Sequence, residues 1–200
     1  MCSSDLLQTT SPMWRQGFSQ FLPDPDDVDT FLNEIFAAEA QCITGDLDFS
    51  TELAKVLFDW EISHSTDEVL TMWQQIYSIE GMLDVVQWVR QQQIEACLAT
   101  NQQTYRTQFM RYTMDYNSHF DHQFYSCELM AAKPNPDYFF EVLLRLDMRP
   151  SDVLFIDDSN QNVQAAMDLD IDSIEFRALD YQHPGNQLKQ IISAYLARKN

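Results

Sequence analysis

Residues 153–162 read Val-Leu-Phe-Ile-Asp-Asp-Ser-Asn-Gln-Asn, an apolar run that ends in two adjacent carboxylates, Asp157 and Asp158. A short continuous apolar run before polar turn residues is typical of a strand buried in a parallel sheet. The residues after the carboxylates have helical character from about 160 to 168. This stretch therefore predicts a strand over 153–156 that leads through two acidic side chains into a helix.

The same alternation of helix and short apolar run extends in both directions from this stretch. Further apolar runs lie at 96–99, 124–125 and 173–176, and each follows a segment with helical spacing. Helices that alternate with strands imply a parallel sheet that is covered on both faces. We therefore expect an α/β fold, with a Rossmann-like core formed by residues 1–14 and 80–200.

Residues 24–79 differ, because their apolar residues repeat at helical spacing without strand-like runs. Two stripes show this spacing: Leu53, Val56, Leu57 and Trp60, and then Val69, Met72, Trp73, Ile76 and Tyr77. The second stripe predicts a helix that begins near Ser65, where Glu68 follows three residues later, and that reaches Tyr77. We expect residues 15–79 to form a helical unit beside the core.

The chain is strongly acidic, with 31 Asp and Glu residues against 12 Lys and Arg residues and a net charge of −19. Such a surface repels phosphate backbones and anionic lipids, which argues against nucleic-acid binding and a membrane-surface role. A small phosphorylated ligand stays compatible, because a local cation or bound metal can reverse the field at one site. Cysteines without a CxxC pair and the lack of a visible secretory or membrane-spanning segment indicate a cytoplasmic protein. We expect it to be a monomer or a homodimer.

Polar residues with suitable chemistry follow the predicted strands. Ligands of open parallel sheets bind beyond the carboxyl ends of the strands. Thr100 and Asn101 follow one run, Asp157 and Asp158 follow another, and Lys133 lies between them in a turn that holds two prolines. Carboxylates suit Mg²⁺, which bridges to phosphate, while hydroxyl and ammonium groups donate to phosphate oxygens. The sequence therefore predicts a phosphate and metal site at this edge.

These residues, in this order, resemble three motifs of the haloacid dehalogenase-like (HAD) hydrolase superfamily, in the subclass with a helical cap. Leu98-Ala-Thr100-Asn101 resembles the second motif, Lys133 in Ala-Ala-Lys-Pro-Asn-Pro the third, and Asp157-Asp158-Ser-Asn-Gln-Asn the fourth. The resemblance implies an Mg²⁺-dependent phosphatase of a small phosphorylated metabolite that works through an aspartyl-phosphate.

The resemblance also implies a role for each of these residues. Thr100, Lys133 and Asp157 would be catalytic, and Thr100, Asn101 and Lys133 would bind the substrate. Asp157 and Asp158 would hold Mg²⁺. The helical unit would be the cap that covers the site and selects substrates.

The family's first motif, an apolar strand that ends in Asp-x-Asp, is missing or degenerate here. Asp5 can be placed on the first aspartate, but the second then falls at Leu7, and only residues 1–4 remain for the strand. We expect a short or distorted strand over residues 1–7, between the strands that end near Thr100 and Asp157. Asp5 would then be a poorly placed nucleophile. We also expect very low phosphatase activity unless further residues precede Met1.

Two alternatives stay open. One is a non-catalytic or truncated protein that keeps the HAD fold, and the other is a dehalogenase or a phosphoglucomutase-like member. A third possibility, that Asp59 is the nucleophile, is disfavoured, because the apolar run before it continues the helical spacing that starts at Leu53.

Overall fold

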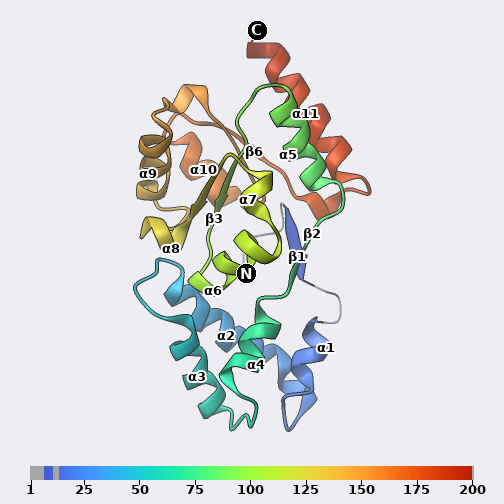
Figure 1. Cartoon of the computed structure of the whole chain (residues 1–200), viewed down its shortest axis with the longest axis vertical. Helices are drawn as coiled ribbons and strands as arrows, with labels where there is room; N and C mark the ends of the chain where they lie inside the picture. Colours follow the sequence, from blue (N-terminus) through green and yellow to red (C-terminus); the bar gives the residue numbers. More distant parts are fainter. Residues whose placement is uncertain (1–6, 11–13, 200) are drawn as a thin grey trace.

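The computed structural model describes residues 7–10 and 14–199, which form a helical lobe and an α/β lobe (Figure 1). The helical lobe contains α1 (Trp14–Ser19), α2 (Val28–Cys42), α3 (Phe49–Asp59) and α4 (Thr66–Trp73). These helices share one hydrophobic core around Trp73, whose buried ring contacts Trp14, Phe18 and Phe36. The helix that the stripe from Leu53 to Trp60 predicts is confirmed by α3.

The helix predicted to reach Tyr77 ends earlier, and this part of the prediction is wrong. α4 stops at Trp73, and Ile76–Ser78 forms the strand β2, which pairs antiparallel with β1 (Gln8–Thr10). Ile76 is buried while Tyr77 is exposed, so the side chains alternate as in a strand. The partner strand lies far away in the sequence, which is why a local helical pattern could not reveal the pairing. β1 and β2 lie where the two lobes meet (Figure 1).

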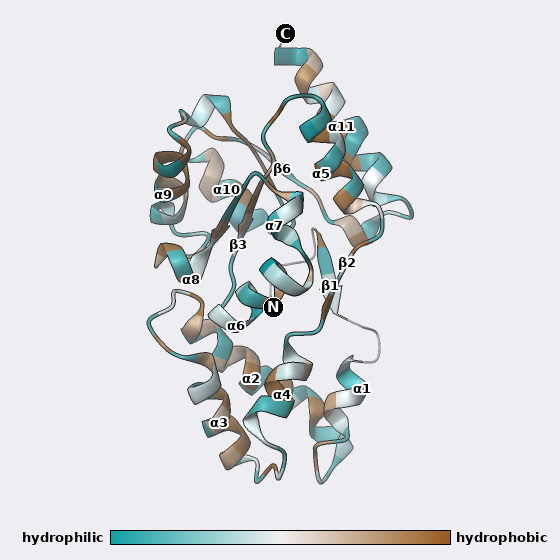
Figure 2. Cartoon of the chain, viewed as in Figure 1, coloured by the Kyte–Doolittle hydropathy of each residue, from teal (hydrophilic) through white to brown (hydrophobic). Residues whose placement is uncertain are grey.

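The α/β lobe contains two pairs of parallel strands. β3 (Cys97–Thr100) pairs with β4 (His122–Tyr125), and β5 (Leu154–Asp157) pairs with β6 (Asp172–Glu175). The strand β3 is mainly hydrophobic and ends in the polar residue Thr100 (Figure 2). The helices of this lobe are α5 (Met82–Gln91), α6 (Thr104–Gln108), α7 (Tyr116–His119), α8 (Ser126–Leu129), α9 (Pro136–Leu146), α10 (Asn160–Met167) and α11 (Pro184–Lys199).

Helices cover both faces of these strands, as the alternation in the sequence predicts. Phe155 of β5 packs in a cluster with residues of α9 and α10, whereas its neighbour Ile156 packs against a cluster formed by α5 and α11. Side chains of consecutive strand residues point to opposite faces, so the two clusters lie on the two sides of the sheet. The Rossmann-like α/β fold with a helical cap is therefore confirmed. None of the described helices is long and apolar enough to cross a membrane.

The position between β3 and β5 is where a first strand was predicted. Residues 1–6 of that predicted strand lie outside the described residues. Within the described part of the chain, β3 and β5 do not pair with each other. Leu7 packs against the clusters that contain Leu98 of β3 and Ile79, and its carbonyl accepts a hydrogen bond from the Ile79 N–H at 2.8 Å. The chain thus passes both clusters just before β1 begins.

The start of α4 makes a test of local stability. The Ser65 side chain accepts from the Glu68 N–H, and the Glu68 carboxylate accepts from the Ser65 N–H at 2.9 Å, which forms a capping box. Ser65→Ala removes the cap and should lower the free energy of unfolding by about 1 kcal/mol in urea titrations. Ser63→Ala, two residues earlier and also exposed, is the matched control and should change it by less than about 0.5 kcal/mol. Equal values for both variants would contradict this role of the cap.

Candidate active site

The structure brings Thr100, Lys133 and Asp157 together at the carboxyl ends of the strands. Thr100 is the last residue of β3 and Asp157 the last residue of β5. The Lys133 ammonium donates to the Ala99 carbonyl at 2.8 Å and to Asp157 Oδ2 at 2.5 Å, so it bridges the two strands. All three predicted side chains are buried. The site therefore combines a hydroxyl, an ammonium and a carboxylate in a place shielded from water.

Asn101 fixes the backbone of Lys133. Its Nδ2 donates to the Lys133 carbonyl at 2.7 Å, and its Oδ1 accepts from the Lys133 N–H at 2.9 Å. Both ends of the amide are thus used on one residue of a neighbouring loop. Asn135 caps the start of α9 directly after this loop, and its Oδ1 accepts from the Asp137 N–H at 2.9 Å. These contacts give Asn101 the geometry of a group that positions Lys133.

Asp157 is held by three donors. Oδ1 accepts from the Ser159 N–H and from Asn162 Nδ2, both at 2.9 Å, and Oδ2 accepts from Lys133. A carboxylate oxygen accepts about two hydrogen bonds, so one acceptor position stays available on Oδ2. Asp158 follows it and is half-buried. Asn162 lies in the predicted motif without a predicted role, and its spacing from Asp157 was the signal that could have shown one.

Thr100 has a hydroxyl proton that no described acceptor takes. Its Oγ1 accepts from Gln102 Nε2 at 3.3 Å, and its side chain is otherwise buried. The loop that follows is held by Ser126, whose Oγ accepts from the Gln102 N–H at 2.9 Å and donates to the Gln102 carbonyl at 3.3 Å. Gln102 and Ser126 were missed from the sequence, because neither belongs to a recognisable pattern. The free hydroxyl proton of Thr100 is suited to an anionic oxygen.

Aromatic rings surround the ammonium group of Lys133. The Tyr138 hydroxyl donates to the Phe124 carbonyl at 2.8 Å, and Lys133 Nζ lies 6.0 Å from the Tyr138 ring centroid and 5.4 Å from that of Phe155. Burial and the nearby Asp157 carboxylate raise the pKa of Tyr138 well above its usual value. Tyr138 therefore stays neutral. In these apolar surroundings the ammonium of Lys133 acts on anions with little screening by water.

The described residues offer a partial site for a hard cation. Mg²⁺ is usually bound through one or two carboxylates, waters and substrate phosphate oxygens. The open acceptor position on Asp157 Oδ2 and the adjacent Asp158 fit such a site. No group of three or more His, Cys, Asp or Glu side chains suited to a metal lies within the described residues. From this part of the chain, Asp157 and Asp158 are the carboxylates that the sequence predicts for the ion. Asp59 is exposed at the end of α3 in the helical lobe, far from any strand end in the chain, which supports its dismissal as nucleophile.

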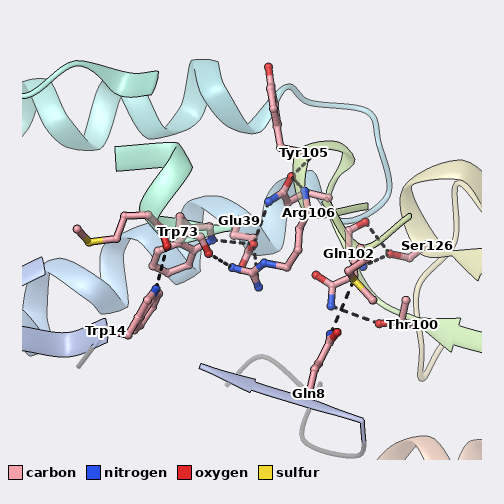
Figure 3. A network of polar contacts seen from close by, with 12 residues as sticks. Gln8, Trp14, Glu39, Trp73, Thr100, Gln102, Tyr105, Arg106 and Ser126 are labelled. Carbon is pink, nitrogen blue, oxygen red and sulfur yellow. Dashed lines mark hydrogen bonds and ion pairs between the residues drawn. The ribbon is translucent and has the colours of Figure 1, made fainter. Parts of the chain in front are cut away.

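The helical lobe joins the α/β lobe next to Thr100 (Figure 3). Buried Glu39 of α2 accepts from Trp73 Nε1 at 2.8 Å and from Gln103 Nε2 at 3.3 Å, and its Oε1 lies 3.5 Å from Arg106 Nη1. Arg106 Nη2 also donates to the Trp73 carbonyl at 2.7 Å. Gln103 and Arg106 lie three and six residues after Thr100 in the chain. The helical lobe therefore lies at the carboxyl ends of the strands, which is the edge predicted for it.

A second contact between the lobes involves Gly45, in the turn after α2. Its φ is +83°, and a Cβ built there would lie 2.4 Å from the Cys127 carbonyl oxygen of α8. The Tyr105 hydroxyl also donates to Asp48 Oδ1 at 2.9 Å across the same boundary. Only glycine allows this close approach of the two backbones. The two lobes are thus also in direct contact through the turn after α2.

The sequence profile of haloacid dehalogenase-like hydrolases matches residues 15–176. Residues 1–14, which include Asp5, are outside this match. No curated protein matches the chain.

Solved structures with a similar fold come from this family. A magnesium complex of a HAD family enzyme from Bacteroides thetaiotaomicron has a TM-score of 0.72 and 19% identity, over 89% of this chain and 91% of that chain. A HAD phosphatase from Thermococcus onnurineus has a TM-score of 0.66 and 16% identity, over 93% of each chain. An L-2-haloacid dehalogenase has a TM-score of 0.60 and 16% identity, over 84% of this chain and 81% of that chain.

At such identities the similarity shows the fold, whereas the profile match covers most of the sequence. Thr100, Lys133 and Asp157, the residues of the three predicted motifs, lie together at the strand ends. The chain therefore belongs to the haloacid dehalogenase-like hydrolases.

Proposed function

We propose that this hydrolase is an Mg²⁺-dependent phosphatase of a small phosphorylated metabolite. The observation that carries the proposal is the buried Lys133 ammonium, which lies between the Ala99 carbonyl and Asp157 beside the unused hydroxyl proton of Thr100. In a chain with a net charge of −19, an anion needs local donors and cations, and Lys133, the Thr100 hydroxyl and a bound Mg²⁺ would supply them at this edge. We also propose that the protein acts in the cytoplasm as a monomer or homodimer.

Each side chain has a separate task in this proposal. Thr100 donates its hydroxyl proton to a phosphoryl oxygen, and Lys133 neutralises the charge of the bound phosphoryl group. Asn101 holds the Lys133 backbone, and Ser159 and Asn162 orient the Asp157 carboxylate through its Oδ1. Because these groups are fixed before the ligand binds, they need little rearrangement during the reaction.

Asp157 and Asp158 are the residues that would hold Mg²⁺. When bound, the ion would supply Lewis-acid stabilisation of charge on the phosphoryl oxygens. The Bacteroides thetaiotaomicron enzyme has been crystallised in complex with magnesium and inorganic phosphate, which supports this assignment by similarity of fold.

The proposed reaction also needs a carboxylate nucleophile. Asp5 is the sole acidic residue before residue 15, and it lies outside the described residues. An attack by a carboxylate oxygen on phosphorus would form an aspartyl-phosphate and release the leaving group as an alcohol. Water would then attack the phosphorus, break its bond to the carboxylate oxygen and release inorganic phosphate, which restores the carboxylate. The second candidate function is a non-catalytic relative that binds phosphate without turnover. The profile match that begins at residue 15 favours it.

The helical lobe would act as a cap over this site, and we propose residues 15–79 as its extent. Thr100 and Asp157 are only 6% and 4% exposed, so a ligand could enter only when the lobe moves away. Closure would exclude water from the reaction. The Glu39–Arg106 contact beside Thr100 would link the position of the lobe to the geometry of the site.

Mg²⁺ should stabilise the protein against heat. At a free concentration ten times Kd, binding to the native state adds about 1.4 kcal/mol, which is a rise in Tm of roughly 3–6 °C. Asp157→Asn should abolish the rise, and Asp158→Asn should weaken it. The quantity compared is the change with Mg²⁺ in each variant, so any loss of basal stability does not matter. Asp152→Asn, an exposed acid paired with Arg149, should retain the full rise. A rise that survives Asp157→Asn would place the metal elsewhere.

Hydrolysis of para-nitrophenyl phosphate separates the two candidate functions. Mg²⁺-dependent turnover that is lost in Asp157→Asn supports the phosphatase, and its loss in Asp5→Asn would identify the nucleophile. Binding of inorganic phosphate without turnover would support the non-catalytic relative. Neither turnover nor phosphate binding would refute both.

A further inference from the structure

Two buried glutamines near Thr100 each have an unsatisfied polar atom. Gln102 lies in the loop after β3 and is 1% exposed, and Gln8 begins β1 and is 3% exposed. The Oε1 atoms of both side chains have no hydrogen-bond partner among the described residues. Buried polar groups are nearly always paired, because an unpaired one destabilises the fold. Two unpaired buried amide oxygens beside one candidate site are therefore unusual for residues with a purely structural role.

Contacts with the rest of the protein hold both side chains in place. Gln102 Nε2 donates to Thr100 Oγ1 at 3.3 Å, and the Gln102 backbone is fixed by Ser126. Gln8 pairs with β2 and directs its Nε2 to the sulfur of Met110 at 3.8 Å, which is a weak acceptor. Figure 3 shows the Gln8 side chain pointing from β1 toward the loop that carries Gln102 and Thr100. The glutamines come from different parts of the chain and face the same region.

We propose that Gln8 and Gln102 form a subsite for hydroxyl groups on the leaving group of the phosphorylated substrate. The inference rests on the proposed function, because Thr100 is taken to bind the phosphoryl group. A hydroxyl on the carbon chain next to the phosphate would donate to an amide oxygen and satisfy it on binding. The subsite therefore selects polyhydroxy phosphomonoesters over those with a bare hydrocarbon chain.

The charges around the subsite favour a neutral donor over an amine. Among the described residues, the buried carboxylates are Glu39 and Asp157, and each already faces a cationic side chain, Arg106 and Lys133 respectively. An ammonium group on the ligand would be buried without a carboxylate of its own, which is costly. A hydroxyl needs only the neutral amide oxygens that the two glutamines offer.

A matched pair of ligands tests the subsite directly. 3,4-Dihydroxybutylphosphonate and butylphosphonate have the same chain and cannot be hydrolysed, and only the first carries hydroxyl groups. By calorimetry in the presence of Mg²⁺, the wild type should bind the dihydroxy ligand about tenfold more tightly, as expected for one to two neutral hydrogen bonds. Gln8→Met should remove most of this preference and keep the affinity for butylphosphonate. Gln102→Met should also reduce the preference.

Gln123→Met is the matched control. Both ends of the Gln123 amide are paired within the protein, with Asn117 Oδ1 at 3.0 Å and with the Tyr125 hydroxyl at 2.8 Å. This variant should leave the ligand preference unchanged and lower Tm. Gln8→Met should instead raise Tm of the ligand-free protein by about 2–4 °C, because it removes an unsatisfied buried acceptor. A structural role for Gln8 would give the opposite sign.

The outcomes separate this inference from the function on which it rests. Equal affinity of the wild type for both phosphonates, together with clear binding of inorganic phosphate, would overturn the subsite and leave the phosphate site intact. A fall in Tm for Gln8→Met like that for Gln123→Met would also overturn it. If neither phosphonate nor inorganic phosphate binds, the proposed function fails and the subsite fails with it.

Discussion

Lys133→Met should lower the free energy of unfolding by about 3–5 kcal/mol, because it leaves the buried carboxylate of Asp157 without its cation. The two side chains are 2% and 5% exposed, and their charged atoms are 2.5 Å apart. Urea denaturation monitored by circular dichroism measures the loss. Lys55→Met is the matched control, since Lys55 is an exposed lysine that pairs with Glu52 on α3. The free energy of unfolding of this control variant should fall by less than about 1 kcal/mol.

The double variant Lys133→Met with Asp157→Leu shows whether the unpaired charge causes the effect. Removing the carboxylate as well should recover about 2 kcal/mol relative to the sum of the single variants. Strict additivity would mean that Lys133 stabilises the fold by packing on Tyr138 and Phe155 rather than by pairing with Asp157.

Glu39→Gln should have the next largest effect and should lower the free energy of unfolding by about 3 kcal/mol. Glutamine keeps an acceptor for Trp73 but removes the charge that faces Arg106, and both residues of the pair are buried. The guanidinium of Arg106 also lies 5.6 Å from the centroid of the Trp73 ring. The substitution should therefore also weaken packing in the core of the helical lobe. Denaturant titration followed by tryptophan fluorescence measures it. Glu52→Gln, on the exposed pair with Lys55, should cost less than about 1 kcal/mol.

An unchanged stability of Glu39→Gln would contradict the link between the lobes. It would mean that the ion pair adds nothing beyond the hydrogen bonds that glutamine preserves. The attachment of the helical lobe beside Thr100 would then depend on apolar contacts and on the close approach at Gly45.

The parts of the fold that the sequence predicts are those with a local signal. The apolar runs at 96–99 and 153–156 became β3 and β5 with a shift of one residue, because a buried parallel strand is apolar along its length. β2 was missed, since Ile76 and Tyr77 also continue a helical stripe and their strand partner is β1, far away in the sequence. Pairing between distant segments leaves no periodic pattern in either one.

The candidate site divides in the same way. Thr100, Lys133 and Asp157 could be predicted, because each follows a strand or a turn with a recognisable motif, and the structure brings them together. The buried link between Glu39 and Arg106 was not predicted, because charged residues on helices usually face solvent. One signal was present: Glu39 lies four residues after the buried Ile35, on the apolar face of α2.

The most direct measurement of the central claim is the binding of inorganic phosphate to the wild type and to Thr100→Val, by calorimetry in the presence of Mg²⁺. The claim is that Thr100 and Lys133 form a phosphate site at the strand ends. We expect one phosphate per chain and at least about tenfold weaker binding to Thr100→Val, which loses a hydrogen bond to a charged oxygen. Thr107→Val is the matched control, because its buried hydroxyl contacts Cys127 instead, and it should bind as the wild type does. Absence of binding to the wild type, or equal affinities for wild type and Thr100→Val, would contradict the account.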